Sequence, residues 1–218
     1  MRPLTDAETK LVFEKLAKYI GGKLKFLIER EDKVYVFRLH RNRVFYCDEN
    51  LLKYAGHFEK KKLVSFGTCI GKFTKTSKFR IHISALGLIS KFAKYKVWVK
   101  PGGEQSFLYG NHILKTHVAR ITEDAPQYSG ICVYNINDLP LGFGTTGKGT
   151  LQIKEADPHS TIVFNQSDVG KKNYDFFIEK YNGIPPITLN QQYLNVYFND
   201  INYLYNENPS FENLDNNG

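Results

Sequence analysis

Residues 95–122 read YKVWVKPGGEQSFLYGNHILKTHVARIT, and residues 139–149 read LPLGFGTTGKG. The first stretch opens with a basic strand at 96–100 that runs into a Pro-Gly-Gly turn, and the second predicts a glycine-dense hairpin. Further strand patterns lie at 130–135, 139–144 and 161–165, and helical periodicity is confined to about 105–116. Many short strands separated by glycine-rich turns are typical of a small β-barrel or pseudo-barrel. We therefore expect the second half of the chain to form one.

The first half of the chain mixes helix and strand patterns. Residues 4–20 predict an amphipathic helix, because Thr5 and Glu8 fit a capping box and Gly21 ends the apolar periodicity. The other expected elements are strands at 24–29, 34–40, 44–47, 63–73 and 79–83, and short helices at 48–55 and 84–93. Since the loops between the first strands are short, these strands should pair antiparallel.

Together these patterns predict an α+β protein of two domains. Residues 1–93 should form an N-terminal α/β sandwich-like domain with an antiparallel sheet, and residues 94–180 should form the β pseudo-barrel. No linker rich in Ser, Gly or Pro occurs near Lys94. We therefore expect the two domains to pack closely.

Charge is distributed unevenly along the chain. The net charge is +8, but residues 181–218 hold four acidic and no basic residues, so all 30 basic residues lie in residues 1–180. A basic body suits a polyanionic partner such as nucleic acid or an acidic membrane surface. The Asn-rich acidic tail should be partly disordered, with a docked helix over 190–206 as the alternative. Its charge predicts contact with protein rather than with RNA.

Cysteine and histidine patterns predict neither a disulfide framework nor a metal site nor a catalytic centre. Cys47, Cys69 and Cys132 are odd in number and lack a CxxC pair, so we expect buried, reduced thiols. The histidines occur singly, and no HExxH or GxSxG motif is present. No stretch approaches the ~20 apolar residues of a membrane span, and the start lacks an apolar signal core. These observations predict an intracellular soluble protein that is not an enzyme.

The glycine cluster imitates two nucleotide-binding motifs. Gly142, Gly144 and Gly147 spell GxGxxG, and residues 142–148 spell GxxxxGK. Both motifs need a helix whose first amides point at phosphate. Here position 149 is Gly instead of Ser or Thr, and residues 149–153 predict extended chain. We therefore expect a hairpin whose glycines let another backbone approach, and no cofactor or small-molecule substrate.

Basic residues beside turns of the expected barrel are the candidate RNA contacts. Cations there could hold a phosphate backbone, with salt-sensitive affinity and little base selectivity, and aromatic rings could stack on an unpaired base. The candidate set is Lys96, Lys100, Tyr109, His112, Lys115, Arg120 and Lys148. A secondary basic face comprises Lys72, Lys75, Lys78 and Arg80. Both sets could also be ordinary solvated surface.

Long motifs in this chain resemble one known family, the Nip-seven proteins that assist assembly of the large ribosomal subunit. The resemblance covers residues 1–170 and is carried by strings that occur in order. They are MRPLT (1–5), FEKLAKYIG (13–21), FRLH (37–40), GTCIGKFTKTSKFRIHISAL (67–86), AKYKVWVKPGGEQSFLYGNHILK (93–115), ARITED (119–124), DLPLGFG (138–144) and VFNQSDVG (163–170).

This resemblance implies a C-terminal PUA domain, a small RNA-binding β-barrel. It also implies a role in 60S subunit biogenesis and pre-rRNA processing in the nucleus and nucleolus. The implied partners are pre-ribosomal RNA and other ribosome assembly factors. We also expect a monomer that binds no membrane. Archaeal relatives have basic residues near the end of the PUA domain, whereas residues 157–161 here are not basic. A protein-interaction adaptor with incidental RNA contact is the alternative, and an RNA-modifying enzyme comes third.

Overall fold

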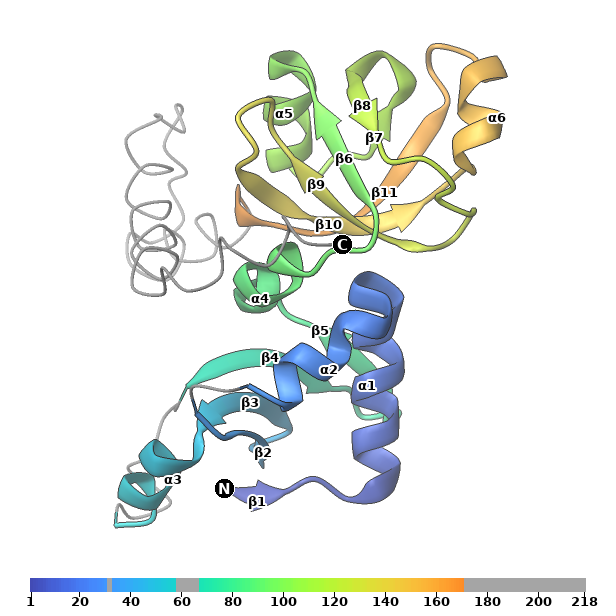
Figure 1. The fold of residues 1–218 in the computed structure, drawn as a ribbon. Coiled ribbons are helices and arrows are strands. Elements are labelled where there is room, and N and C mark those ends of the chain that lie inside the picture. Colours follow the sequence, from blue (N-terminus) through green and yellow to red (C-terminus); the bar gives the residue numbers. More distant parts are fainter. Residues whose placement is uncertain (31–32, 58–66, 171–218) are drawn as a thin grey trace, which may run out of the picture. The chain divides into compact units, whose positions relative to one another are not determined.

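The computed structural model describes residues 1–30, 33–57 and 67–170. They contain two sheets (Figure 1) within a compact unit that spans Met1–Asn173. The predicted disorder and the alternative helix at 190–206 lie outside the described residues, as do positions 63–66 of one predicted strand.

The first sheet is antiparallel throughout, in the order β1-β2-β3-β4-β5. Its strands are β1 (Arg2–Pro3), β2 (Tyr35–His40), β3 (Arg43–Asp48), β4 (Thr68–Phe73) and β5 (Phe79–Ile81). The β2–β3 hairpin turns tightly at Arg41 and Asn42, which both have positive φ. Of the predicted three-strand meander, the antiparallel pairing of β2 with β3 is confirmed.

Helices of the first half include α1 (Asp6–Ile20), α2 (Lys25–Ile28), α3 (Glu49–Ala55) and α4 (Leu86–Lys91), with 3₁₀ turns η1 (Gly21–Leu24) and η2 (Ile83–Ala85). The predicted capping box of α1 is confirmed: the Glu8 amide donates to Thr5 Oγ1, and the Thr5 amide donates to the Glu8 carboxylate. The α1 side chains that face the core are Val12, Leu16, Tyr19 and Ile20.

The second sheet is the predicted pseudo-barrel and is mixed, in the order β7-β11-β10-β9-β6-β8. Its strands are β6 (Lys96–Val99), β7 (Ile113–Leu114), β8 (Val118–Ile121), β9 (Gly130–Tyr134), β10 (Pro140–Thr146) and β11 (Thr161–Asp168). Only the β6–β9 pairing among these is parallel. Helices α5 (Pro101–Leu108) and α6 (Thr150–Glu155) and the 3₁₀ turn η3 (Lys115–His117) fill its connections. The α+β class with its two predicted parts is confirmed.

Four local predictions were wrong. Residues 24–29 do not form a strand. The chain passes from η1 into α2 there, and Leu27 is the one buried residue of these two turns, so no apolar strand face is available to pair with a sheet. The Pro-Gly-Gly segment is the first turn of α5, since Pro suits the first helical position, and α5 ends at Leu108 instead of near 116. Residues 150–155 form α6 instead of extended chain.

The glycines of β10 confirm the hairpin interpretation of the GxGxxG motif. A Cβ on Gly142 would lie 2.4 Å from the Ser167 carbonyl oxygen, and one on Gly144 would lie 2.3 Å from that of Phe164. Both contacts are with β11, the strand that pairs with β10. These positions therefore require glycine because another backbone passes close by.

Residues 83–95 carry the chain from the first sheet to the second. The Lys94 amide donates to the Tyr19 carbonyl oxygen (2.7 Å), and the Tyr134 hydroxyl donates to that of Ser90 (2.8 Å). The Tyr19 ring also meets the Phe143 ring edge-on, with centroids 5.3 Å apart. The domain boundary near residue 93 stays a prediction, because both sheets belong to one compact unit.

Candidate nucleic-acid interface

Two cations and two aromatic rings form a continuous row on β6, β8 and β9. Val97 and Val99 of β6 are fully buried, so strand alternation turns Lys96 and Trp98 to the outer side. Trp98 pairs with Arg120 on β8 and with Tyr134 on β9. We call Lys96, Tyr134, Trp98 and Arg120 the cation–aromatic row.

The contacts within the row are close. The Arg120 guanidinium lies 3.8 Å from the centre of the Trp98 ring, and the Trp98 and Tyr134 rings stack with centroids 5.9 Å apart. The Lys96 ammonium lies 5.5 Å from the Tyr134 ring centre. Each cation over a ring contributes ~0.5–1 kcal/mol at exposed sites. The row therefore holds its cations in place before any ligand arrives.

Asp138 fixes one end of this row. The Trp98 indole N–H donates to Asp138 Oδ1, and the Arg120 guanidinium lies 3.9 Å from the same oxygen. Asp138 has φ +61 in the turn between β9 and β10, where the Asn135 side chain accepts from two backbone amides. The Arg120 side chain nevertheless remains 65% exposed, so the outer face of its guanidinium is open to a ligand.

Lys115 and Lys148 lie elsewhere, beside α6 and the turn that follows it. The Lys115 ammonium donates to the carbonyl oxygens of Lys154 (3.0 Å) and Ala156 (2.5 Å). Cations commonly satisfy the last carbonyls of a helix in this way. The Lys148 ammonium donates to Ser160 Oγ at 3.1 Å. Both lysines thus hold α6 and its following turn, and their role in RNA binding stays a prediction.

The remaining candidates lie around α5. Lys100 is exposed at the N-cap of α5, and Tyr109, 60% exposed, follows its last residue. His112 Nδ1 accepts from the Asn165 amide (3.2 Å), and its ring meets that of Phe164 edge-on. His112 is therefore held by β11, whereas Tyr109 is an exposed ring suited to stacking.

The structure thus distributes the predicted contacts among three places, and it brings Lys96 and Arg120 together through two rings that the sequence prediction did not include. Trp98 is the single tryptophan of the chain and lies two residues after Lys96 in a strand. That spacing is a sequence signal that would have placed both side chains on one face. The partnership with Tyr134 has no local signal.

Among the described residues, thiols and other polar clusters give no further site. Cys47 and Cys132 are buried free thiols as predicted, and burial raises the pKa of Cys132 to about 12. Cys69 is also free but only half-buried. Within residues 1–30, 33–57 and 67–170, no group of three His, Cys, Asp or Glu side chains could hold a metal ion. No helix in this part of the chain is long and apolar enough to cross a membrane.

The mixed pseudo-barrel after an α+β unit defines a PUA-domain protein. A PUA-domain structure from Aeropyrum pernix matches 78% of this chain and 85% of its own, with a TM-score of 0.51 at 12% identity. A hypothetical protein from Pyrococcus horikoshii matches 80% of this chain and 98% of its own, with a TM-score of 0.53 at 13% identity. At such low identity the likeness shows the fold alone.

Sequence comparison gives the family. Residues 1–83 match the model described as NIP7/UPF0113, pre-PUA domain, and residues 95–171 match the UPF0113 PUA domain. Proteins named 60S ribosome subunit biogenesis protein NIP7 homolog are 57% identical in Xenopus laevis and 56% in Mus musculus. Each alignment spans 171 residues, 78% of this chain and 95% of the relative. The chain belongs to the NIP7 family, which confirms the resemblance stated above.

Proposed function

We propose that this protein is an RNA-binding assembly factor of the large ribosomal subunit, which contacts pre-ribosomal RNA through its PUA domain. Relatives that are 56–57% identical to it over 171 aligned residues are named for 60S subunit biogenesis. That name supports a role in pre-rRNA processing and a location in the nucleus and nucleolus. The protein acts by binding, without a catalytic step and as a monomer.

The cation–aromatic row is the observation that carries RNA binding. Unpaired RNA bases stack on aromatic rings and on arginine guanidinium planes. The Arg120 guanidinium carbon already lies 3.8 Å from the centre of the Trp98 ring, so an incoming base can stack on the outer face of the guanidinium. Lys96 at the other end of the row, and the exposed Lys100 nearby in sequence, supply charge for the phosphates.

Stacking and charge make separable contributions. A base stacked on an aromatic or guanidinium plane contributes ~1–3 kcal/mol and tolerates many sequences. Phosphate contacts instead lower the affinity as salt rises, with a log–log slope of about −0.7 per contact for a single strand. Loss of Arg120 should therefore weaken binding through both contributions, whereas loss of Lys96 should act mainly on the slope.

The test is binding of an unstructured RNA oligonucleotide to the full chain over a range of salt concentrations. We expect Lys96→Ala with Arg120→Ala to weaken binding and to flatten the slope by roughly one to two units. Lys10→Ala with Lys23→Ala is the matched control, since both lysines are exposed on the first half of the chain. Equal affinity and slope in the two double variants would reject the row as the RNA site. Absence of RNA binding by the unmodified protein would favour the adaptor function.

A further inference from the structure

Three cations form a second row, on the outer face of the first sheet. Arg43 on β3 is the register partner of Lys72 on β4, and Lys72 is the partner of Arg80 on β5. Direct cross-strand partners share a face of the sheet, with Cβ atoms ~4.5–5.5 Å apart. All three residues are exposed. We call them the sheet basic row.

The opposite face of the same strands supports this assignment. Val44, next to Arg43, is fully buried, and Phe79, next to Arg80, is 7% exposed. A Cβ on Gly71, next to Lys72, would lie 2.5 Å from the Phe79 ring, so Gly71 and Phe79 share the inner face. Alternation therefore places Arg43, Lys72 and Arg80 on the side opposite Val44, Gly71 and Phe79, while the rest of β3 is buried on both sides.

The sheet basic row is not neutralised within the described chain. In the ion pairs of the described chain, the acidic residues are Glu8, Glu29, Asp48 and Asp138. Each of them pairs with a cation that is not part of the sheet basic row. Like charges directly opposite one another in a sheet are destabilising. The row thus retains an electrostatic cost that an anionic ligand would remove.

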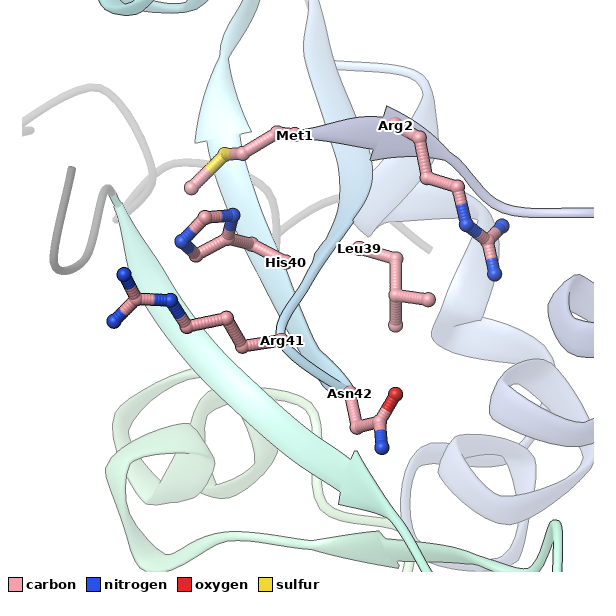
Figure 2. A pocket seen from close by; sticks show the side chains of 6 residues that line it. All are labelled: Met1, Arg2, Leu39, His40, Arg41 and Asn42. Carbon is pink, nitrogen blue, oxygen red and sulfur yellow. The ribbon is translucent and has the colours of Figure 1, made fainter. Parts of the chain in front are cut away.

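Positive charge also extends beyond the row on both sides. On α1, burial and the nearby charges of Lys18 and Arg80 lower the pKa of Lys15. At the β2–β3 turn, Figure 2 shows His40 and Arg41 projecting to one side of the hairpin, together with Met1, and Arg2 and Leu39 projecting to the other. These residues line a pocket of about 350 Å³. Lys15 and Arg41 therefore place further cations beside the row, whereas Arg2 is paired with Glu8.

We propose that the sheet basic row is a second RNA contact, which binds the phosphate backbone of the RNA held by the PUA domain. The proposal rests on the proposed function, because it takes the partner to be RNA. Strands ~4.8 Å apart space the three side chains regularly, and long flexible cations on such a row can follow successive phosphates. No aromatic residue belongs to this row, so it should add salt-dependent affinity without base selectivity.

Of the residues predicted as the secondary basic face, Lys72 and Arg80 belong to this row. Lys75 lies in the β4–β5 turn, and Lys78 immediately precedes β5, where its amide donates to Thr74 Oγ1. Arg43 was absent from the prediction, because its position beside Lys72 depends on the β3–β4 register. The predicted set was a run along one sequence segment, whereas the sheet basic row extends across three strands.

The test uses the full chain carrying Arg43→Gln, Lys72→Gln and Arg80→Gln. The ligand is a single-stranded RNA long enough to contact both sheets at once. Loss of three phosphate contacts should flatten the log–log salt slope by about two units. The charge-matched control is Lys10→Gln, Lys23→Gln and Lys53→Gln, which removes three exposed lysines elsewhere. Because the row residues are exposed, the thermal midpoint of the triple variant should be unchanged or slightly higher, which separates lost binding from lost folding.

Comparison with the PUA-domain double variant separates this proposal from the proposed function. If the row variant binds RNA like its charge-matched control while Lys96→Ala with Arg120→Ala weakens binding, the row proposal is wrong and the proposed function stands. If the unmodified protein binds no RNA, both fail. Loss of binding to polyglutamate or anionic vesicles, with RNA binding unchanged, would also reject an RNA site on the row.

Discussion

The Tyr19 hydroxyl donates a hydrogen bond to Gln166 Oε1 at 2.5 Å, and so joins α1 to β11 across 147 positions of sequence. The Gln166 amide nitrogen in turn donates to Thr145 Oγ1 on β10. Tyr19 is 2% exposed, and burial raises its pKa above the ordinary value for tyrosine. The phenol thus stays neutral and available as a donor where the helix of the first sheet meets the barrel.

Tyr19→Phe should lower the free energy of unfolding by about 1 kcal/mol. The variant keeps the ring contact with Phe143 and removes only the hydrogen bond. Gln166 is exposed, so water can take over part of the lost bond and keep the cost moderate. Urea unfolding measures the change, with Tyr109→Phe as the exposed control. Equal midpoints for the two variants would show that the bond does not contribute to stability.

Acid should weaken the N-terminal cap of α1. Hydrogen bonds from the Arg2 guanidinium, and then from the Thr5 amide, lower the pKa of Glu8 to about 2, whereas its ordinary value is 4.5. A carboxyl with a lowered folded pKa contributes stability that is present above the ordinary value and is lost as pH falls toward the folded value. The loss should therefore occur between about pH 4.5 and pH 2.

Glu8→Gln isolates this effect, because Gln cannot ionise. The difference in urea midpoint between the unmodified protein and Glu8→Gln should be largest near neutral pH and should shrink as pH falls below about 4. Only the difference between the two proteins is informative, since other carboxyls titrate in the same range. A difference that is constant from pH 6 to pH 2 would contradict the low pKa of Glu8.

Gly142→Ala should destabilise the barrel by ~1–3 kcal/mol. The added methyl group would lie 2.4 Å from the Ser167 carbonyl oxygen and 2.9 Å from the Phe107 ring, so backbone and core must both shift. Gly102→Ala is the control, because a Cβ there has open space in α5 and alanine favours the helix. We expect thermal midpoints that fall for Gly142→Ala and stay equal or rise for Gly102→Ala. A harmless Gly142→Ala would refute the close approach of β11.

Lys115→Met should lower stability whether or not RNA is present. The ammonium donates to the carbonyl oxygens of Lys154 and Ala156, and methionine keeps the length of the side chain without its donors. Each lost bond contributes ~0.5–1.5 kcal/mol. Lys100→Met, at an exposed N-cap, is the comparison. A thermal midpoint that is unchanged in Lys115→Met would show that these bonds do not contribute to stability, so that the ammonium is available to bind RNA.

Sequence patterns predicted the elements whose signals are local. The Thr5–Glu8 capping box and the Asp48 N-cap lie within one helical turn of the residues that they stabilise. The helix at 150–155 has no comparable signal. It depends on the Thr150 side chain, which donates to the Thr122 carbonyl oxygen and accepts from the Ala125 amide. Those partners lie 28 and 25 positions away, beyond the reach of local periodicity.

The candidate site shows the same limit. Composition and turn positions selected Lys96 and Arg120, and strand alternation could have added Trp98. Their meeting depends on β6 lying between β8 and β9 in the sheet. Lys115 was selected for its charge, but its contacts depend on α6, a helix that the sequence did not predict. Side chains whose function depends on non-local pairing are therefore the ones that sequence patterns assign least well.

The fluorescence of Trp98 tests the central claim most directly, because it is the single tryptophan of the chain and the middle of the cation–aromatic row. An unstructured RNA is titrated into the full chain while indole emission and the anisotropy of a label on the RNA are followed together. The account predicts a saturable change in Trp98 emission with the same midpoint as the anisotropy, and loss of both with Lys96→Ala and Arg120→Ala. Saturating RNA binding by anisotropy with no change in Trp98 emission would contradict it.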